Sequence, residues 1–360
     1  MAAAVGALLL AGPLASGSAS ASEREWQVAA NPRSSVDDII DAGHAVDIAT
    51  SKDQMVVTWE VQPEDDEGPY QGAWRLYDRD KGRVADGAFG TVREASARID
   101  AVAFDGGFLL TDYRKHRRYV LNAEGRLTPA RFATSKVGPS LARGVLAPDE
   151  SSDGAWDVLL PSPQRVVALT DLPTDNVQGI ELTSDGTVWV LLPWTDNGPF
   201  KIAHAKDGKP PWTTETIPLP KGSSTDGEGI SAQRDRLFVV ASHEQGDRMA
   251  MAVDAILVRT AGEKGWKTVD ASGISDNLTV APRIGVLPKG RLVATASSEG
   301  AWIQKLDDSG FTTLHPPRTH PHANPTVQQE GRWLWSSEQN IGTALRYSYD
   351  YGRTWHEFVR

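Results

Sequence analysis

The stretch YSYDYGRTWHEFVR (347–360) contains an ordered octet, S-x-D-x-G-x-T-W, formed by Ser348, Asp350, Gly352, Thr354 and Trp355. Each of these residue types suits a tight turn. An Asp side chain accepts backbone N–H bonds across its own turn, and Gly adopts a positive φ angle without steric cost. A Thr hydroxyl satisfies another turn group, and a Trp ring buries a large apolar area against a neighbouring sheet. The octet therefore predicts a β-hairpin turn with a structural role rather than a catalytic one.

The rest of the chain repeats one hairpin pattern, an apolar half-strand, a polar turn and a strongly apolar half-strand. Seven segments follow it: 46–61, 99–113, 144–161, 180–193, 230–243, 284–297 and 325–338. Their turns, from Asp53 to Gly331, recur at a mean spacing of about 46 residues, which is typical of a propeller blade. A second hairpin follows most of them, at 74–89, 118–132, 201–217, 255–270, 302–315 and 345–358.

Two hairpins in each period make a four-stranded antiparallel blade. The pattern predicts an all-β fold, a β-propeller of seven blades with six as the alternative, in one domain over residues 46–360. The unit that begins near Gly144 is short and predicts a degenerate blade. The octet falls in the second hairpin of the last blade, one strand from the C-terminus. We therefore expect each blade to be built from contiguous sequence, without exchange between the termini.

At that turn the chain resembles the Asp-box family, also called BNR repeats. Its S-x-D-x-G-x-T-W signature recurs between the third and fourth strands of blades in sialidases and other propellers. The stretches AKDGKPPW (205–212) and AGEKGW (261–266) are similar to eroded copies at equivalent turns. The resemblance implies a sialidase-like superfamily, and the fold hosts both glycoside hydrolases and non-catalytic propellers.

The N-terminal residues 1–21 have the pattern of a signal peptide. An apolar run from Ala2 to Ala15 is followed by Ala19-Ser20-Ala21 in A-x-A form. We expect a secreted or extracytoplasmic protein in which residues 22–45 form a lead-in with one helical turn near Val36 to Ile40. No later apolar run reaches the length of a transmembrane helix. The chain has no cysteine, which excludes disulfides, thiolate nucleophiles and Cys-based metal sites.

The charge of the chain limits its partners. A formal net charge of -10 opposes binding to nucleic acid or to an anionic membrane surface. We expect no nucleic acid partner, no membrane insertion, no metal and no cofactor, and we expect a monomer. The predicted partner is a carbohydrate or other anionic small ligand, or a partner protein.

In a propeller, loops from every blade converge where the innermost strands begin, and ligands usually bind there. Arg98, Arg143 and Arg283 precede or begin inner strands of three different blades, and guanidinium groups bind carboxylates bidentately. Sialidases resemble this arrangement, with an arginine triad that grips the sialic acid carboxylate. The stretches ARIDAVAFDGGFLL (97–110) and PRIGVLPKGRLVA (282–294) are similar to the R-I-P motif of that triad, with Asp100 and Gly285 in place of the proline. Further predicted substrate-binding residues are Asp226, His44, His322 and Asn324.

Hydrolysis of sialidase type also needs a nucleophile and a proton-transfer group, and the family uses a tyrosine activated by a glutamate. Tyr113 and Tyr347 are the predicted nucleophiles. Asp47, Asp100 and Glu228 are the predicted proton-transfer groups, because burial near the channel mouth raises the pKa of a carboxylate.

Two hypotheses remain open. The first is a sialidase-like glycoside hydrolase that acts on an anionic sugar at the channel mouth. The second is a non-catalytic propeller that binds a glycan, a peptide or a partner protein, in which the same charged residues form ordinary salt bridges and turn bonds.

Overall fold

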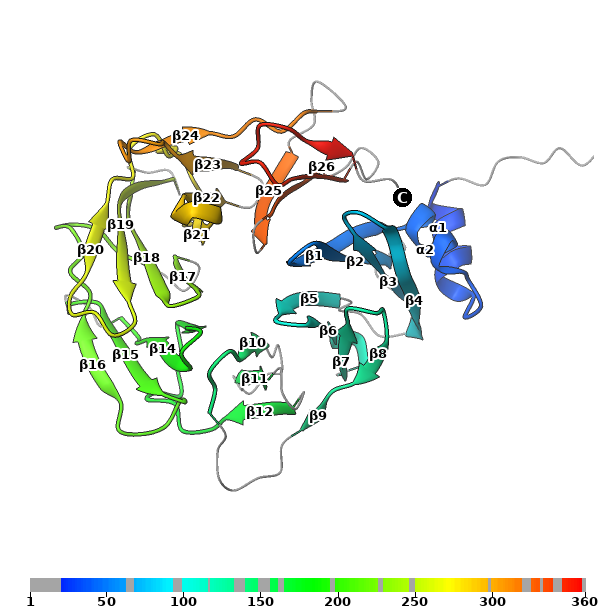
Figure 1. Ribbon diagram of the computed structural model, residues 1–360, viewed down its shortest axis with the longest axis horizontal. Helices are drawn as coiled ribbons and strands as arrows, with labels where there is room; N and C mark the ends of the chain where they lie inside the picture. The colour runs from blue at the N-terminus through cyan, green and yellow to red at the C-terminus, as the bar shows by residue number, and fades with distance from the viewer. Residues whose placement is uncertain are drawn as a thin grey trace, which may run out of the picture.

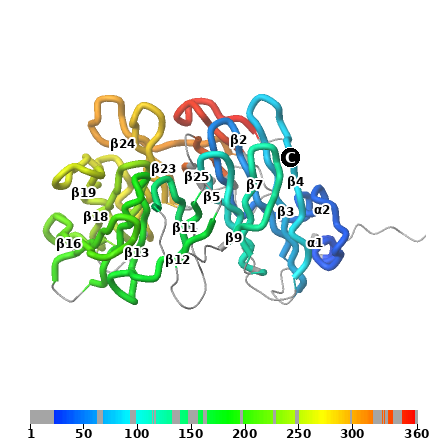
Figure 2. Tube along the Cα trace, turned by 60° about the horizontal axis from the view of Figure 1, so that its bottom comes forward, coloured from blue at the N-terminus to red at the C-terminus, as the bar shows by residue number. Residues whose placement is uncertain are grey.

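The computed structural model describes residues 21–62, 68–92, 99–115, 117–132, 140–147, 156–160, 165–194, 198–225, 229–245, 250–296, 299–318, 325–330, 333–338 and 345–357. The signal-peptide prediction falls almost entirely outside them and stays a prediction. Seven four-stranded sheets surround a central axis, which confirms the predicted all-β propeller and decides for seven blades (Figure 1). The oblique view of Figure 2 shows the same sheets arranged in a ring.

Six blades follow the sequence order from the inner to the outer strand. Blade 1 contains β1 (His44–Ser51), β2 (Gln54–Val61), β3 (Tyr70–Asp78) and β4 (Gly82–Val92), and blade 2 contains β5 (Ile99–Phe104), β6 (Gly107–Asp112), β7 (Arg117–Asn122) and β8 (Leu127–Pro129). Blade 4 contains β13 (Gly179–Leu182), β14 (Thr187–Leu191), β15 (Lys201–Lys206) and β16 (Thr213–Thr216). Blade 5 contains β17 (Ile230–Gln233), β18 (Arg236–Glu244), β19 (Met251–Thr260) and β20 (Lys267–Val269). Blade 6 contains β21 (Arg283–Val286), β22 (Leu292–Ala296), β23 (Gly300–Gln304) and β24 (Phe311–Thr313). Blade 7 contains β25 (Pro325–Glu330), β26 (Trp333–Glu338), β27 (Leu345–Ser348) and β28 (His356–Glu357).

Blade 3, predicted to be degenerate, has a different strand order. Its three antiparallel strands are β10 (Val145–Ala147), β11 (Trp156–Leu160) and β12 (Arg165–Leu169). The outer position is filled by β9 (Arg131–Phe132), which precedes them in sequence and pairs with β12 in parallel. The short repeat thus obtains its fourth strand from the chain that leaves blade 2.

The strand patterns follow from their positions in the ring. The second strand of a blade is covered on both faces by neighbouring blades, so β2 is buried along almost its whole length. The outer strand β4 is only partly buried along most of its length, because it lies at the edge of its sheet. This contrast explains why the inner hairpins are the more apolar ones in the sequence.

Two helices pack against blade 1, at the outer edge of the ring (Figure 2). They are α1 (Ala21–Ala30) and α2 (Val36–Ala42), so the predicted helical turn is confirmed and α1 is an additional element. Ser35 caps α2 by accepting a bond from the Asp38 amide, and the Asp38 carboxylate accepts the Ser35 amide in return. Ile39 and Ile40 are buried in this packing, which brings the first turn of α2 toward β3.

The octet forms the predicted turn between the third and fourth strands of blade 7. Asp350 Oδ1 accepts the Thr354 amide at 2.8 Å and the Ser348 hydroxyl at 2.9 Å, and Ser348 Oγ accepts the Gly352 amide at 3.0 Å. Gly352 has a φ of 77°. The Trp355 ring packs against apolar residues of blades 6 and 7. These contacts hold the turn closed and pack it against the neighbouring blade.

The ring closes where blade 7 meets blade 1, and we call this junction the seam. Both terminal blades are built from contiguous sequence, so no strand is exchanged across the seam, as predicted. Trp335 of β26 packs among Ile48, Met55, Val57 and Trp59 of blade 1. The indole N–H of Trp333 donates to the Lys52 carbonyl at 3.1 Å. Side-chain packing therefore closes the ring in place of a shared strand.

The described helices are too short and too polar for a membrane span.

Candidate functional site

Some of the predicted site residues lie outside the described part of the chain: Arg98, Asp226, Glu228, His322 and Asn324. Their roles stay predictions.

The two predicted acids of blades 1 and 2 lie in neighbouring inner strands. Asp47 Oδ2 accepts the Ala101 amide of β5 at 2.8 Å, and Asp47 Oδ1 accepts the Ile48 amide at 2.8 Å. The Asp47 carboxylate thus joins β1 to β5. Asp100 is only 7 % exposed. His44 is exposed and is the first residue of β1, two residues earlier than the predicted start of the propeller domain.

The predicted arginine grip is only partly described. Arg283 begins β21, and its guanidinium donates to Glu181 Oε1 of β13 at 3.0 Å. Arg143 is exposed, with a φ of 62°, and its amide donates to the Ser184 carbonyl. Ser184 follows the last residue of β13, whereas the predicted binding site lies at the first residue, Gly179. Arg143 is therefore at the other end of this strand.

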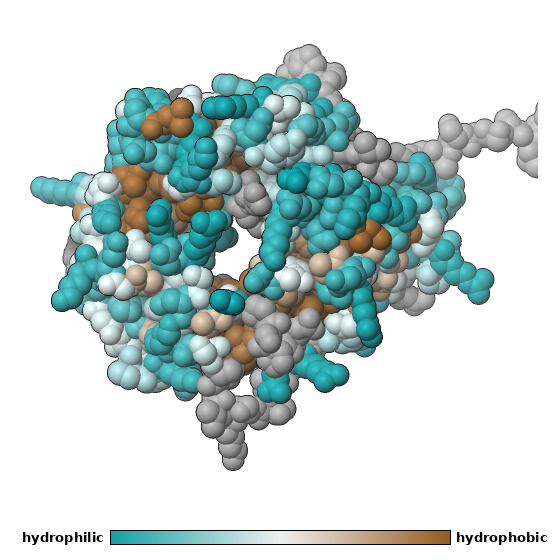
Figure 3. Space-filling model, in the orientation of Figure 1, coloured by the Kyte–Doolittle hydropathy of each residue, from teal (hydrophilic) through white to brown (hydrophobic). Residues whose placement is uncertain are grey.

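Glu181 is a residue that sequence reasoning missed. It sits on the inner strand of blade 4, and its partner Arg283 belongs to blade 6, so the pair reaches past blade 5 along the channel side. Figure 3 shows this central channel as an open passage with many hydrophilic residues around it. The Glu181 side chain is 14 % exposed. Burial raises its pKa to about 7, although Arg283 lowers it.

The two predicted nucleophiles lie outside the inner strands. Tyr113 is buried in the short 3-10 helix η1 (Tyr113–Lys115) of blade 2. Tyr347 lies in β27, and its ring packs against Trp333 and His356 at centroid distances of 5.1 and 5.3 Å. Tyr347 therefore faces the seam rather than the channel mouth.

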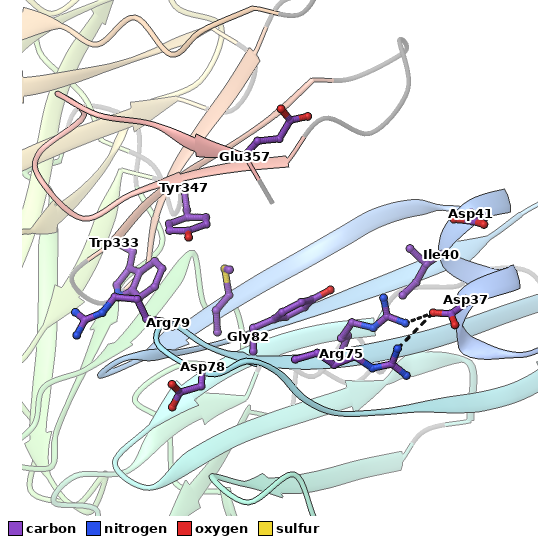
Figure 4. Close-up of a pocket in the computed structure, with 13 residues that line it drawn as sticks. Asp37, Ile40, Asp41, Arg75, Asp78, Arg79, Gly82, Trp333, Tyr347 and Glu357 are labelled. Atoms are coloured by element: carbon purple, nitrogen blue, oxygen red, sulfur yellow. Dashed lines mark hydrogen bonds and ion pairs between the residues drawn. The ribbon is translucent and has the colours of Figure 1, made fainter. Parts of the chain in front are cut away.

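The seam contains a pocket of about 610 Å³. Helix α2 and strands β2, β3 and β4 form one wall, and strands β26, β27 and β28 form the other. Figure 4 shows Tyr347 and Trp333 of blade 7 opposite Arg75, Asp78 and Arg79 of blade 1. The lining residues are Asp37, Ile40, Asp41, Met55, Arg75, Tyr77, Asp78, Arg79, Gly82, Arg83, Trp333, Tyr347 and Glu357. We refer to this cavity as the seam pocket.

The blade 1 wall of the seam pocket is fixed by a buried arginine. Arg75 of β3 is 3 % exposed and forms an ion pair with Asp37 of α2 (Figure 4). It forms a second ion pair with Asp86 of β4 at 3.2 Å. Arg83 pairs with the same two carboxylates, with Asp37 at 3.7 Å. This four-membered network holds α2 against the β3–β4 hairpin and thereby shapes the pocket.

The blade 7 wall is aromatic. Residues two apart in a strand share a face, and Tyr347 pairs with both Trp335 and His356 across the sheet. Trp333, Trp335, Tyr347, Tyr349 and His356 therefore line one face of blade 7, turned toward blade 1. Trp333 and Met55 are each 3 % exposed, so the pocket floor is apolar.

Both tyrosines of the pocket hold their protons at neutral pH. Burial raises the pKa of Tyr77, and burial together with the neighbouring Tyr349 raises the pKa of Tyr347. Within the described residues no group of His, Asp and Glu side chains has the arrangement of a metal site. The pocket therefore offers hydrogen-bond donors, π faces and charges, and it contains no ionised tyrosine.

The sequence signal for this pocket was weak. Its lining residues come from α2, the β3–β4 hairpin and the last blade, which are nearly 300 residues apart and meet only because the ring closes. Sequence reasoning missed it; the charged stretch RLYDRDKGR (75–83) is the one signal that could have indicated it, since alternate residues of a strand lie on one face.

Comparison with known proteins supports the fold alone. No protein-family model matches the chain, and no curated protein sequence does. Among solved structures, a puromycin-hydrolyzing peptidase from Mycobacterium tuberculosis is similar with a TM-score of 0.50 and 12 % identity, covering 91 % of this chain and 54 % of the peptidase. A puromycin hydrolase mutant complexed with PGG has a TM-score of 0.51 and 13 % identity, covering 93 % of this chain and 55 % of that one. The chain thus spans about half the length of both.

A virginiamycin B lyase from Staphylococcus aureus, solved with quinupristin, gives a TM-score of 0.49 and 13 % identity. It covers 83 % of this chain and 93 % of the lyase. At these sequence identities the comparisons show the propeller fold and assign no activity to this chain.

Proposed function

We propose that this protein is a ligand-binding β-propeller and that the seam pocket takes a small organic molecule. The observation that carries the proposal is the cavity of about 610 Å³ between the first and last blades. Small-molecule pockets typically measure about 300–1,000 Å³ and combine apolar walls with a few placed polar groups. The seam pocket has this composition, with Met55, Ile40 and Trp333 as apolar surface and charged residues around them.

Binding suits the state of the side chains better than catalysis does. A tyrosine nucleophile must lose its proton, and burial raises the pKa of Tyr347 and so opposes that loss. The arginines of the pocket are each paired with aspartates of the chain itself. The side chains of the pocket thus form a fixed binding surface, and they do not have the arrangement of an activated nucleophile with its base.

The test is a ligand-observed NMR screen of small aromatic and aliphatic fragments against three proteins. Arg83→Trp places a large ring in the pocket, because Arg83 lines it and is 50 % exposed. Lys81→Trp adds the same ring to the same hairpin at a residue that is 79 % exposed and does not line the pocket. We expect fragments that bind the wild type and Lys81→Trp but not Arg83→Trp. Finding no fragment that Arg83→Trp specifically loses would contradict the proposal.

A second candidate is the predicted sialidase-like hydrolase at the channel. One observation favours it, the contact between Arg283 and Glu181 on the channel side. A general acid works best with a pKa near the operating pH, and the pKa of Glu181 is about 7. Arg283, which is 66 % exposed, has further N–H groups for an anionic sugar.

This candidate is tested by release of a fluorogenic group from a sialoside. Turnover by the wild type that is lost in both Arg283→Ala and Glu181→Gln supports it. If the wild type releases no more of the fluorogenic group than a blank does, the protein is not a sialidase. This outcome does not affect the proposal that the seam pocket binds a ligand.

A further inference from the structure

We propose that the ligand of the seam pocket is a small organic cation, a compact substituted ammonium group that binds among the aromatic rings. This inference rests on the proposed function and specifies the chemical class of the ligand. It is carried by two independent features of the pocket, the pairing of its charges and the position of its rings.

The positive charges of the pocket are already engaged. Arg75 is paired with Asp37 and Asp86, and Arg83 with the same two carboxylates. Arg79 forms ion pairs with Asp53 at 2.9 Å and with Asp80 at 3.2 Å. Because carboxylates of the chain already neutralise these guanidinium groups, an anionic ligand gains less from them than it would from unpaired arginines.

Carboxylates outnumber guanidinium groups around the cavity. The three lining arginines face six carboxylates, which are Asp37, Asp41 and Asp78 in the lining and the partners Asp53, Asp80 and Asp86. Glu357 is not counted, because it lies opposite Arg346 across β27 and β28, on the other face of blade 7 from Tyr347. Arg24 and Lys81 approach Asp41 and Asp78 only at 3.9 and 4.0 Å, and both cations are more than half exposed. An excess of one negative charge remains even when both are counted, and such a local field attracts a cation.

Among the lining aspartates, Asp41 and Asp78 are the two whose cationic neighbours approach only at 3.9 and 4.0 Å. Asp41 of α2 is 56 % exposed, and Figure 4 shows it beyond Ile40 at the edge of the cavity. The carboxylate of Glu357 points away from Tyr347 in the same view. A cation is therefore attracted to the cavity by its carboxylates, and the rings that line the same cavity supply the contact surface.

The rings supply the contact surface for such a group. Tyr77, Trp333 and Tyr347 all line the cavity, and the Trp333 and Tyr347 rings lie 5.1 Å apart at 41° to each other. A cation placed within about 6 Å of a ring centroid is attracted by the negative face of the ring, and Trp and Tyr are the strongest partners. A substituted ammonium group also buries its carbon atoms against Met55 and Ile40, which a metal ion or a bare ammonium ion cannot do.

The experiment compares three ligands of nearly the same shape and different charge by isothermal titration calorimetry. They are choline, the neutral 3,3-dimethylbutan-1-ol and the anionic 3,3-dimethylbutanoate. We expect choline to bind about tenfold more tightly than the neutral alcohol, since cation–π contacts of a desolvated group have about this size. We expect the anion to bind more weakly than both.

Two pairs of variants locate the effect. Tyr347→Phe keeps the ring and is expected to keep the preference for choline, whereas Tyr347→Leu removes the ring and is expected to lower it several-fold. Asp41→Asn is expected to weaken choline about two- to threefold and to leave the neutral alcohol unchanged. Its matched control is Asp308→Asn, at an exposed turn of blade 6, which is expected to change neither affinity.

The outcomes separate this inference from the proposed function. Equal binding of choline and the alcohol, or tightest binding of the anion, overturns the cation inference. Absence of binding by all three overturns it as well, and the fragment screen then decides the fate of the pocket itself. A choline preference that survives Tyr347→Leu and Asp41→Asn unchanged also overturns it, because the cation then binds elsewhere.

Discussion

Replacing Glu181 by glutamine removes the buried carboxyl group of the channel wall while keeping its shape. The pKa of Glu181 is about 7 in the folded protein, because burial disfavours the charged form, and its ordinary value is 4.5. The folded chain therefore binds this proton more tightly than the unfolded chain does. The stability that results is fully present below about pH 4.5 and is lost as the pH rises through 7.

The magnitude follows from the size of the pKa shift. A difference of about 2.5 pKa units corresponds to about 3 kcal/mol of unfolding free energy between about pH 4 and about pH 8. Glu181 is mostly buried, at 14 % exposure of its side chain, so solvent screening reduces this value little. Over that interval the wild type is expected to lose about 3 kcal/mol relative to Glu181→Gln, which has no carboxyl proton to lose.

Urea unfolding of both proteins across this pH range measures the difference directly. Carbon-13 NMR titration of the Glu181 carboxyl gives the pKa itself, and Arg283→Leu is expected to raise that pKa further because the guanidinium lowers it. A stability difference between wild type and Glu181→Gln that does not change with pH would show that the pKa of Glu181 is not raised in the folded protein.

Three further substitutions test the architecture by urea unfolding. Gly352→Ala is expected to lower the unfolding free energy by about 1–2 kcal/mol, because Gly352 has a φ of 77° and an added Cβ would lie 2.8 Å from Leu314 Cδ2. An unchanged unfolding free energy would show that the turn adapts to the added methyl group without strain. Arg75→Met is expected to lower the unfolding free energy by about 3 kcal/mol, because it breaks a buried ion pair, whereas Arg83→Met at a half-exposed position is expected to lower it by less than about 1 kcal/mol. Equal losses would show that the buried ion pairs do not hold α2 in place. Trp335→Leu at the seam is expected to lower the unfolding free energy by about 2–3 kcal/mol, whereas Trp194→Leu at an exposed position is expected to leave it nearly unchanged. An unchanged value for Trp335→Leu would mean that other contacts close the seam.

The blade architecture was largely predictable from the sequence, because each blade is a local unit of four consecutive strands. Hairpins bring together residues a few positions apart, so alternation and turn residues such as Asp185 and Gly352 carry enough information. Blade 3 shows the limit of such reasoning. Its outer strand β9 has two residues and pairs in parallel, and a strand that short has no alternation to detect.

The candidate site was much harder to predict, because its residues meet only through ring closure. Comparing the residues at which the inner strands begin identified Arg283 as a candidate binding residue. Its partner Glu181 was not identified, because it lies inside a strand two blades away. Arg143 lies elsewhere, because the segment before β10 turns toward Ser184. Ser184 follows the last residue of β13, so Arg143 lies near the end of this inner strand and not near its beginning. Tyr347 was selected as a nucleophile at the channel, and it lies instead in the seam pocket, where burial keeps it protonated.

The most direct test of the account is a crystal structure of the protein soaked with choline, or with the tightest fragment from the NMR screen. We expect ligand density in the seam pocket, between α2 and Tyr77 on one side and Trp333 and Tyr347 on the other. Density in the central channel beside Glu181 and Arg283, with the seam pocket empty, would contradict it.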